Sequence, residues 1–210
     1  MAHIPDGVVS NEILIVSSVA AIAAISYGVR KLESDKIPQT AMMAAVFFIS
    51  SLITFPVGPS SIHLLFNGLM GLMLGWAAVP AIFVALTLQL MFFGYGGLLS
   101  LGLNTFNMAL PAIIVALTLR PLLLAKMNSA ALSKPLSMSI GALAGAFSIA
   151  LTTAMLSASL VLSGQEFAPM LNVLLATNVP LLIVESAVTA VIVSFLIRTS
   201  PQTFNPSFSR

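Results

Sequence analysis

Residues 172–197 read NVLLATNVPLLIVESAVTAVIVSFLI, an apolar run whose one charged residue is Glu185. A helix needs about 20 predominantly apolar residues to cross the hydrocarbon core of a bilayer. The run is longer than this, and it contains no cluster of turn residues that would end a helix. It therefore predicts a transmembrane helix, and similar runs recur along the chain.

The composition of the whole chain agrees with a protein that uses the bilayer as its solvent. Of the 210 residues, 59% are hydrophobic and 7% are charged, and the mean hydropathy is +1.08. Soluble domains carry roughly 25% charged residues, and a soluble fold of this composition would expose large apolar patches. The sequence therefore predicts an all-α fold, a polytopic membrane helix bundle that forms a single domain over residues 1–210.

Several kinds of site are excluded by what the sequence lacks. It has no cysteine, which excludes disulfides, thiolate metal ligands and cysteine nucleophiles. The net charge of +2 is small and scattered, so we expect no nucleic acid partner. No Gly-rich loop leads into Lys-Ser or Lys-Thr, so we expect no ATP site in this chain. A His-Glu-Xaa-Xaa-His pair is missing as well, and we expect that the protein is not an enzyme.

Polar, Pro and Gly punctuation divides the apolar sequence into about seven transmembrane helices. The third and fourth are short, and they are either tilted or a broken pair around Pro80. Small residues at Gly71 and Gly75, and at Gly141 and Gly145, favour close packing of helices in lipid. The predicted spans are Val8–Val29, Ile37–Phe55, Leu64–Val79, Ala81–Phe93, Phe106–Leu124, Leu136–Leu162 and Asn172–Ile197.

The basic residues predict how the bundle is oriented in the membrane. With seven crossings, all eight Lys and Arg residues fall on one side, which the positive-inside rule makes cytoplasmic. We therefore expect a multi-pass protein of the cell membrane with its N-terminus outside and its C-terminus cytoplasmic. No basic residue precedes Arg30, so the N-terminus is not expected to be a cleaved signal. Residues 199–210 are expected to form a loose cytoplasmic tail.

The two histidines, His3 and His63, both fall on the predicted outer side. If Met1 is removed, the amine of Ala2, the amide nitrogen of His3 and its imidazole supply three nitrogen ligands, and His63 supplies a fourth. If Met1 is retained, Met1-Ala2-His3 supplies four nitrogens by itself. Either set favours square-planar coordination, which suits Ni²⁺ or Cu²⁺ and is tolerable for Co²⁺.

A simpler interpretation is that His3 is solvated and that His63 is an interfacial loop residue. Two features favour the metal hypothesis. Ile4-Pro5-Asp6-Gly7 predicts a rigid turn that holds the N-terminus in place. The run Phe55-Pro56-Val57-Gly58-Pro59-Ser60-Ser61-Ile62-His63 predicts loop structure beside a cavity inside the membrane.

These motifs, with Phe93-Gly94-Tyr95-Gly96-Gly97-Leu98 and the following Leu101-Gly102-Leu103-Asn104-Thr105-Phe106-Asn107-Met108, resemble the CbiM/NikM family. Members of this family are the substrate-binding membrane subunits of energy-coupling-factor importers of cobalt and nickel. The resemblance covers most of the chain. It implies that an N-terminal segment, residues 1–7, enters the bundle, and that Ala2 (or Met1), His3 and His63 bind Ni²⁺ or Co²⁺ as the transported substrate.

The chain departs from the family at two points. Ala2 is inserted where many members begin Met-His, and Met removal would restore that spacing. Tyr95 stands where many members have a histidine, so we predict no direct metal role for it. Further polar residues are predicted around the ligands as possible second-shell groups: Asp6, Ser61, Asn67, Asn104 and Asn107. Asp6 either orients His3 or caps the first helix, and the amides of Asn104 and Asn107 are expected in a loop folded back into the protein.

Glu185 has two interpretations, as a hydrogen-bonded packing residue or as a second cation site. For function, the resemblance implies the substrate-binding component of an ATP-driven uptake transporter. The implied partners are a coupling transmembrane subunit, cytoplasmic ATPase subunits and a small accessory membrane subunit, all within the lipid bilayer or at its surface. The alternative is a secondary metal-ion carrier that works without an ATPase.

Overall fold

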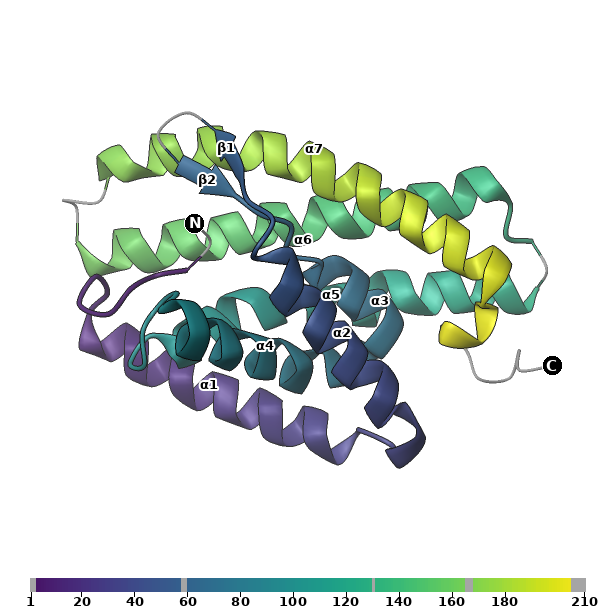
Figure 1. The fold of residues 1–210 in the computed structure, drawn as a ribbon, viewed down its shortest axis with the longest axis horizontal. Coiled ribbons are helices and arrows are strands. Elements are labelled where there is room, and N and C mark those ends of the chain that lie inside the picture. The colour runs from purple at the N-terminus through teal and green to yellow at the C-terminus, as the bar shows by residue number, and fades with distance from the viewer. Residues whose placement is uncertain (1–2, 58–59, 130, 165–167, 205–210) are drawn as a thin grey trace.

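A bundle of α-helices, elongated along one axis, makes up the computed structural model, which describes residues 3–57, 60–129, 131–164 and 168–204 (Figure 1). This confirms the predicted helical bundle, and the exception is a small hairpin of two three-residue strands, β1 (Phe55–Val57) and β2 (Ser60–Ile62). The helices are α1 (Asn11–Arg30), α2 (Ile37–Ser50), α3 (Asn67–Leu74), α4 (Ala78–Phe93), α5 (Leu101–Asn128), α6 (Lys134–Ser163) and α7 (Ala168–Thr199).

Five helical segments of the described chain are long and apolar enough to cross a membrane by themselves. They are Asn11–Arg30, Asn67–Phe93, Leu101–Asn128, Lys134–Ser163 and Leu174–Thr199. The segment Asn67–Phe93 contains two helices, α3 and α4. Helix α2 has 14 residues, about 21 Å at 1.5 Å per residue, which is short of the ~30 Å hydrocarbon core. The count of seven crossings and the orientation of the termini stay predictions.

Helix α2 ends five residues earlier than predicted, at Ser50 instead of Phe55. The hydroxyl of Ser50 donates to the carbonyls of Phe47, at 2.7 Å, and Leu64, at 2.9 Å. Downstream, Pro56 disfavours helical backbone in the residue before it, and Phe55 begins β1. The predicted loop after this span is therefore partly a hairpin that returns the chain to His63.

The break between α3 and α4 lies at Gly75, not at Pro80. Gly75 has φ +61° and ψ −128°, which glycine adopts readily because it has no Cβ. Pro80 is the third residue of α4, where its missing N–H is one of those that have no intrahelical partner. Gly75 was predicted to be a packing residue, and its role as the break corrects this.

Helix α5 begins at Leu101, whereas the predicted span begins at Phe106. The connection from α4 is therefore residues 94–100, and Asn104 and Asn107 lie on the first two turns of a helix. Their prediction in a folded-back loop is wrong. On a helix the two amides face different neighbours.

The burial pattern is that of a protein whose apolar side chains face lipid. Large apolar residues on α1 and α7, such as Val19 and Ile183, are more than 60% exposed, whereas Glu185 is 0% exposed. Helices α6 and α7 pack closely where Gly141 and Gly145 meet the backbone of α7, and a Cβ at Gly141 would lie 2.8 Å from Ala190 Cα. The predicted packing role of these two glycines is confirmed.

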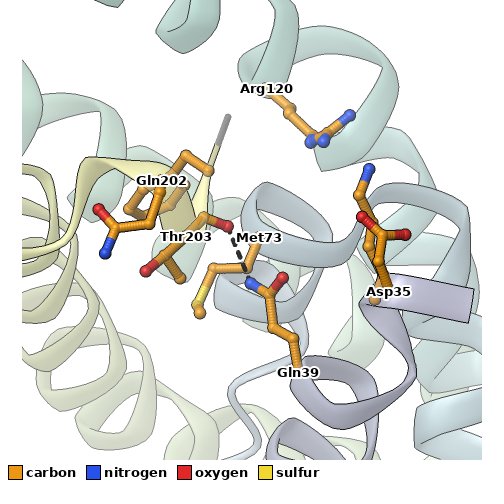
Figure 2. A pocket seen from close by; sticks show the side chains of 8 residues that line it. Asp35, Gln39, Met73, Arg120, Gln202 and Thr203 are labelled. Carbon is orange, nitrogen blue, oxygen red and sulfur yellow. Dashed lines mark hydrogen bonds between the residues drawn. The ribbon is translucent and has the colours of Figure 1, made fainter. Parts of the chain in front are cut away.

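One end of the bundle gathers the α1–α2 connection, the α5–α6 connection and the end of α7 (Figure 1). We call it the basic end, because its segments carry the basic residues Arg30, Lys31, Lys36, Arg120, Lys126, Lys134 and Arg198. The start of the predicted tail is packed instead of loose. Phe204 is 1% exposed, and Gln39 Nε2 donates to the carbonyl of Thr203 at 2.8 Å (Figure 2).

Candidate metal centre

The N-terminal segment folds back into the bundle. His3 and Ile4 are 9% and 4% exposed. Ile4 and Val9 pack with Leu103 of α5 and Leu156 of α6 in a small apolar cluster. The structure thus shows the first residues it describes inside the protein. Met1 and Ala2, the remaining predicted N-terminal ligands, lie outside the described residues.

Two polar side chains fasten the N-terminal segment to the start of α5. The amide of Asn104 accepts from the N–H of Ile4 at 2.9 Å and donates to its carbonyl at 3.0 Å. The carboxylate of Asp6 accepts from the N–H groups of Ser100, at 2.8 Å, and Leu99, at 3.3 Å. Asp6 therefore binds the two residues that precede α5 and does not cap α1. With its two bonds Asn104 pairs with the backbone of Ile4, the residue after His3, as a neighbouring β-strand would.

Hydrogen bonding also lowers the pKa of the Asp6 carboxyl. Desolvation by itself would raise this pKa, but the N–H groups of Ser100 and Leu99 stabilise the charged form and outweigh it. Asp6 is thus ionised throughout the neutral range. A negative charge at the N-terminal end of α5 also interacts favourably with the helix dipole.

The paired glycines of the α4–α5 connection leave room for this segment. A Cβ on Gly97 would overlap the carboxylate of Asp6, and a Cβ on Gly96 would lie 2.9 Å from Asn104 Nδ2. Gly96 has φ +78°, a conformation that strains other residues. The Gly96-Gly97 motif is therefore explained by the close approach of residues 3–6.

The fold brings the two histidines together although 60 positions separate them in the sequence. Their ring centroids are 5.7 Å apart, with an interplanar angle of 22°. His63 is 4% exposed, and the Nε2 atoms of both rings are buried without a hydrogen-bond partner. Buried polar atoms normally have a partner. Two buried imidazole nitrogens that lack a hydrogen-bond partner can instead serve as ligands of a metal ion. Metal–imidazole bonds are about 2.0–2.1 Å long.

Both imidazoles are held neutral by their surroundings, which is the form that binds metal. The pKa of His3 is lowered to about 3, mainly by burial and in addition by electrostatic repulsion from His63. Burial also lowers the pKa of His63, against the opposing effect of its hydrogen bond with Leu64. Nδ1 of His63 lies 3.1 Å from the carbonyl of Leu64, so that nitrogen carries the proton and Nε2 keeps its lone pair.

An aromatic row closes the site on the side of α4. Tyr95 stacks on His3 with ring centroids 5.8 Å apart, Phe93 lies 5.6 Å from Tyr95, and Phe48 lies 5.4 Å from Phe93. Tyr95 was predicted to have no direct metal role, and its stacking on His3 was not predicted. The signal was present, because Tyr95 lies directly before the glycines that receive the N-terminal segment.

Glu185 of α7 holds the backbone that follows His63. Its two carboxylate oxygens accept from the N–H groups of Leu65, at 3.0 Å, and Phe66, at 2.6 Å. These groups lie at the N-terminal end of α3, where Phe66 has φ +52°. Of the two interpretations of Glu185, hydrogen bonding inside the protein is the one that these contacts support.

The comparisons with known proteins agree with this architecture. The sequence matches the CbiM family model, described as the cobalt uptake substrate-specific transmembrane region, over residues 3–203. The chain belongs to the CbiM family. A protein of Haemophilus influenzae named as a metal transport protein is 38% identical over 204 residues, which make up 97% of both chains.

Two further proteins that are similar to this CbiM family chain are transporters. The fused nickel transport protein NikMN of Rhodobacter capsulatus is 39% identical over 113 residues, which cover 51% of this chain and 33% of that relative. A solved structure, a truncated transition metal transporter, is 28% identical with a TM-score of 0.73, over 93% of this chain and 96% of that one. The family and these relatives point to a membrane component of metal uptake rather than to an enzyme.

The polar residues that were predicted around the metal ligands lie in different parts of the fold. Asn67 donates to Thr152 Oγ1 at 2.9 Å and so ties α3 to α6. Asn107 lines an apolar groove formed by α1, α5 and α6, and its Nδ2 is buried without a partner. Ser61 lies in β2, and its side chain is outside what the structure describes. Asp6, within the N-terminal segment, and Asn104 of α5 are the two candidates whose side chains join that segment to the start of α5.

The side chains of the described residues offer a histidine pair and no larger metal cluster. No group of three or more His, Asp or Glu residues that could hold an ion occurs among them. Further ligands of an ion at His3 and His63 would then come from other groups, such as backbone nitrogens, the terminal amine or water. The predicted N-terminal ligands, Ala2 or Met1, lie outside the described residues and stay predictions.

Proposed function

We propose that this CbiM family protein is the substrate-binding transmembrane component of an ATP-driven nickel or cobalt uptake transporter in the cell membrane. Its substrate ion, Ni²⁺ or Co²⁺, is bound by His3, His63 and the chain start, with Ala2 as the terminal residue or Met1 if it is retained. The ion enters from the outer side and leaves toward the cytoplasm when partner subunits distort the bundle.

The observation that carries the proposal is the position of His3 beside His63 in the protein interior. An N-terminal segment fixed by Asn104 and Asp6 loses little additional freedom when it binds an ion, so the ligands are preorganised. Neutral imidazoles with deprotonated nitrogens of the chain start form a nitrogen donor set. Such a set suits Ni²⁺ and Co²⁺ better than Ca²⁺ or Mg²⁺, which prefer oxygen ligands.

The sequence has no phosphate-binding loop, so ATP-driven transport would take its energy from partner subunits. We propose a coupling transmembrane subunit, cytoplasmic ATPase subunits and a small accessory membrane subunit. The name NikMN of the Rhodobacter capsulatus relative, a fused nickel transport protein, supports the association with a second component. A secondary carrier remains the alternative, and it predicts uptake without ATP.

Blocking the chain start tests the proposed ligands. We would compare a chain that has a histidine-free tag at its N-terminus with one that has the same tag at its C-terminus. The C-terminally tagged protein should bind about one Ni²⁺ or Co²⁺ per chain by calorimetry and metal analysis, and the N-terminally tagged protein should bind none tightly. Equal binding by the two proteins would reject the proposal.

The same measurement on His63→Ala separates the two forms of the N-terminus. If intact mass shows that Met1 is removed, the substitution should weaken binding strongly, because one of four nitrogens is lost. If Met1 is retained, the loss should be modest. Unchanged affinity in a chain that begins at Ala2 would exclude His63 as a ligand. For energy, uptake into proteoliposomes that hold this chain alone, without ATP, would favour the secondary carrier.

A further inference from the structure

Two neighbouring cavities open at the basic end of the bundle. The first, of about 250 Å³, is lined by Asp35, Lys36, Gln39, Met73, Arg120, Gln202, Thr203 and Phe204 (Figure 2). The second, of about 260 Å³, is lined by Lys31, Leu32, Lys36, Leu74, Gly75, Trp76, Ala77, Ala116, Leu117 and Arg120. They share Lys36 and Arg120. Three basic side chains thus face this space, and Asp35 is the one acidic residue that lines it.

Arg120 is the fixed cation of the space. Its Nε donates to the carbonyl of Leu72, at the end of α3, at 3.2 Å. Gly75 lies beside the guanidinium, and a Cβ there would be in ordinary contact with Nη1 at 3.4 Å. Arg120 has no ion pair with a carboxylate among the described residues, and the one ion pair there joins Lys36 Nζ to Glu33 at 3.1 Å. The terminal nitrogens of a half-buried guanidinium are therefore available to an anion from outside the chain.

Aromatic residues place the second cavity at the depth of lipid headgroups. Trp76 lines this cavity and packs edge-on against Tyr27, with ring centroids 4.5 Å apart. Lys31 Nζ lies 5.7 Å from the centre of the Tyr27 ring. Trp, Tyr and Lys gather at the membrane–water interface because their side chains are amphipathic. An anion bound here would lie level with phosphate groups of the bilayer.

The wall of the second cavity is continuous with the lipid-facing surface. Leu117 of α5 lines the cavity and is 57% exposed, and Val29 near the end of α1 is 52% exposed. Acyl chains can lie against such apolar side chains while a headgroup enters the basic space. A soluble anion would gain nothing from this apolar flank.

We propose that this space binds the phosphate headgroup of an anionic phospholipid. Arg120 takes the phosphate through its free nitrogens, since guanidinium and phosphate form paired hydrogen bonds, and Lys31 and Lys36 add charge. Basic pockets between transmembrane helices on the cytoplasmic side are a recurring type of anionic lipid site. Because Arg120 also holds the carbonyl of Leu72, a bound lipid stabilises the end of α3. The proposal does not depend on the metal site.

The test compares thermal unfolding and lipid binding of the full chain in vesicles or nanodiscs of defined composition. Phosphatidylglycerol should raise the melting temperature above that in phosphatidylcholine and remain bound in native mass spectra. The double variant Lys31→Gln/Lys36→Gln should bind phosphatidylglycerol more weakly, by about fivefold for each charge removed. The matched control is Lys126→Gln/Lys134→Gln, which removes two basic residues of the same end that do not line the cavities, and it should bind like the unaltered chain.

Arg120→Gln gives a further variant, and the lysine pair keeps the test valid if that chain does not fold. Three outcomes would overturn the proposal. Equal losses in the two lysine pairs would indicate diffuse attraction to the surface. Equal stabilisation by inorganic phosphate in phosphatidylcholine would indicate a soluble anion site. A chain that shows no preference for phosphatidylglycerol over phosphatidylcholine, and that needs Lys31 and Lys36 only for assembly with partner subunits, would have a protein interface here.

Discussion

Asp6 shows how a single exposed carboxylate supports a buried site. It lies three residues after His3, and its bonds to Ser100 and Leu99 hold the N-terminal segment on the start of α5. Asn104 adds two hydrogen bonds to the backbone of Ile4, each worth about 0.5–1.5 kcal/mol net. Neither residue needs to touch the ion in order to fix the position of His3.

Asp6→Asn tests this support and its pH dependence. The folded pKa of Asp6 lies below its usual 3.8, so its stabilisation is complete above about that pH and is lost as the pH falls through the folded pKa. We expect the variant to melt a few degrees lower at neutral pH and to bind Ni²⁺ about 10-fold more weakly. The difference in melting temperature should shrink on acidification below pH 3.8. A constant difference at every pH would contradict the role of the charge.

Glu185→Gln tests the carboxylate that holds the backbone after His63. The glutamine oxygen can accept one of the two N–H groups of Leu65 and Phe66, but its NH2 group opposes the other. An unsatisfied buried group costs about 1–3 kcal/mol, so we expect a lower melting temperature and Ni²⁺ affinity reduced about 10- to 100-fold.

The matched control for Glu185→Gln is Ser186→Ala, the next residue of α7. The hydroxyl of Ser186 donates to the carbonyl of Leu182 in its own helix, so its loss should leave metal binding unchanged. If Ser186→Ala weakened Ni²⁺ binding as much as Glu185→Gln, packing of α7 and not the carboxylate would be responsible.

At this scale the sequence reveals residue types but not their partners. His3 and His63 stand out because they are the two histidines of the chain, and a motif accompanies each. The pairing of Asn104 with Ile4 spans 100 positions and follows no local pattern, so it needs the fold. Tyr95 was missed because it was judged as a ligand, while its observed contact is ring stacking on His3.

Helix α3 connects the metal site with the basic end of the bundle. All eight of its residues are buried, Glu185 accepts hydrogen bonds at its N-terminal end, and Arg120 donates to Leu72 near its C-terminal end. A negative group at the start and a positive group at the end of a helix both complement its dipole. Gly71 lets α3 pack on the backbone of α5 at Ala112. Charges from α5 and α7 thus hold a helix that is too short to be stable alone.

Gly97→Ala tests the fit between the α4–α5 connection and the N-terminal segment. The added methyl group overlaps the carboxylate of Asp6, so we expect the segment to dock less well and Ni²⁺ affinity to fall about 10-fold or more. Gly94→Ala is the control, because Gly94 lies in the same connection and a Cβ there would meet nothing within 4 Å, although its φ of +67° strains alanine. Similar losses in the two variants would show that the backbone conformation of the connection, and not the overlap with Asp6, limits binding.

The helices themselves were more predictable than their ends. Long apolar runs identify α1, α5, α6 and α7, because lipid requires them. The end of α2 at Ser50 and the start of α5 at Leu101 depend on hydrogen bonds to Leu64 and Asp6 from other parts of the chain. Gly75 and Pro80 are both helix-breaking residues in the sequence, and only the three-dimensional packing of α3 decides that the break falls at Gly75.

The whole molecule separates a basic end from an end with the metal site. The α1–α2 and α5–α6 connections lie at the basic end, and the N-terminal segment enters near the α4–α5 connection at the other (Figure 1). If the positive-inside rule holds, an ion from outside meets His3 and His63 first, and the three basic side chains of the lipid cavities face the cytoplasm. This arrangement suits uptake and would not suit export.

Because the chain has no native cysteine, single cysteines can report this orientation directly. Leu98→Cys lies in the α4–α5 connection and Ser129→Cys follows α5, and both positions are exposed. A membrane-impermeant maleimide applied to intact cells should label Leu98→Cys, whereas Ser129→Cys should react only after permeabilisation. The cysteine-free parent controls for background. The reverse pattern would place the histidines on the cytoplasmic side, and the same bundle would then have to release its ion outward, which the uptake hypothesis does not allow.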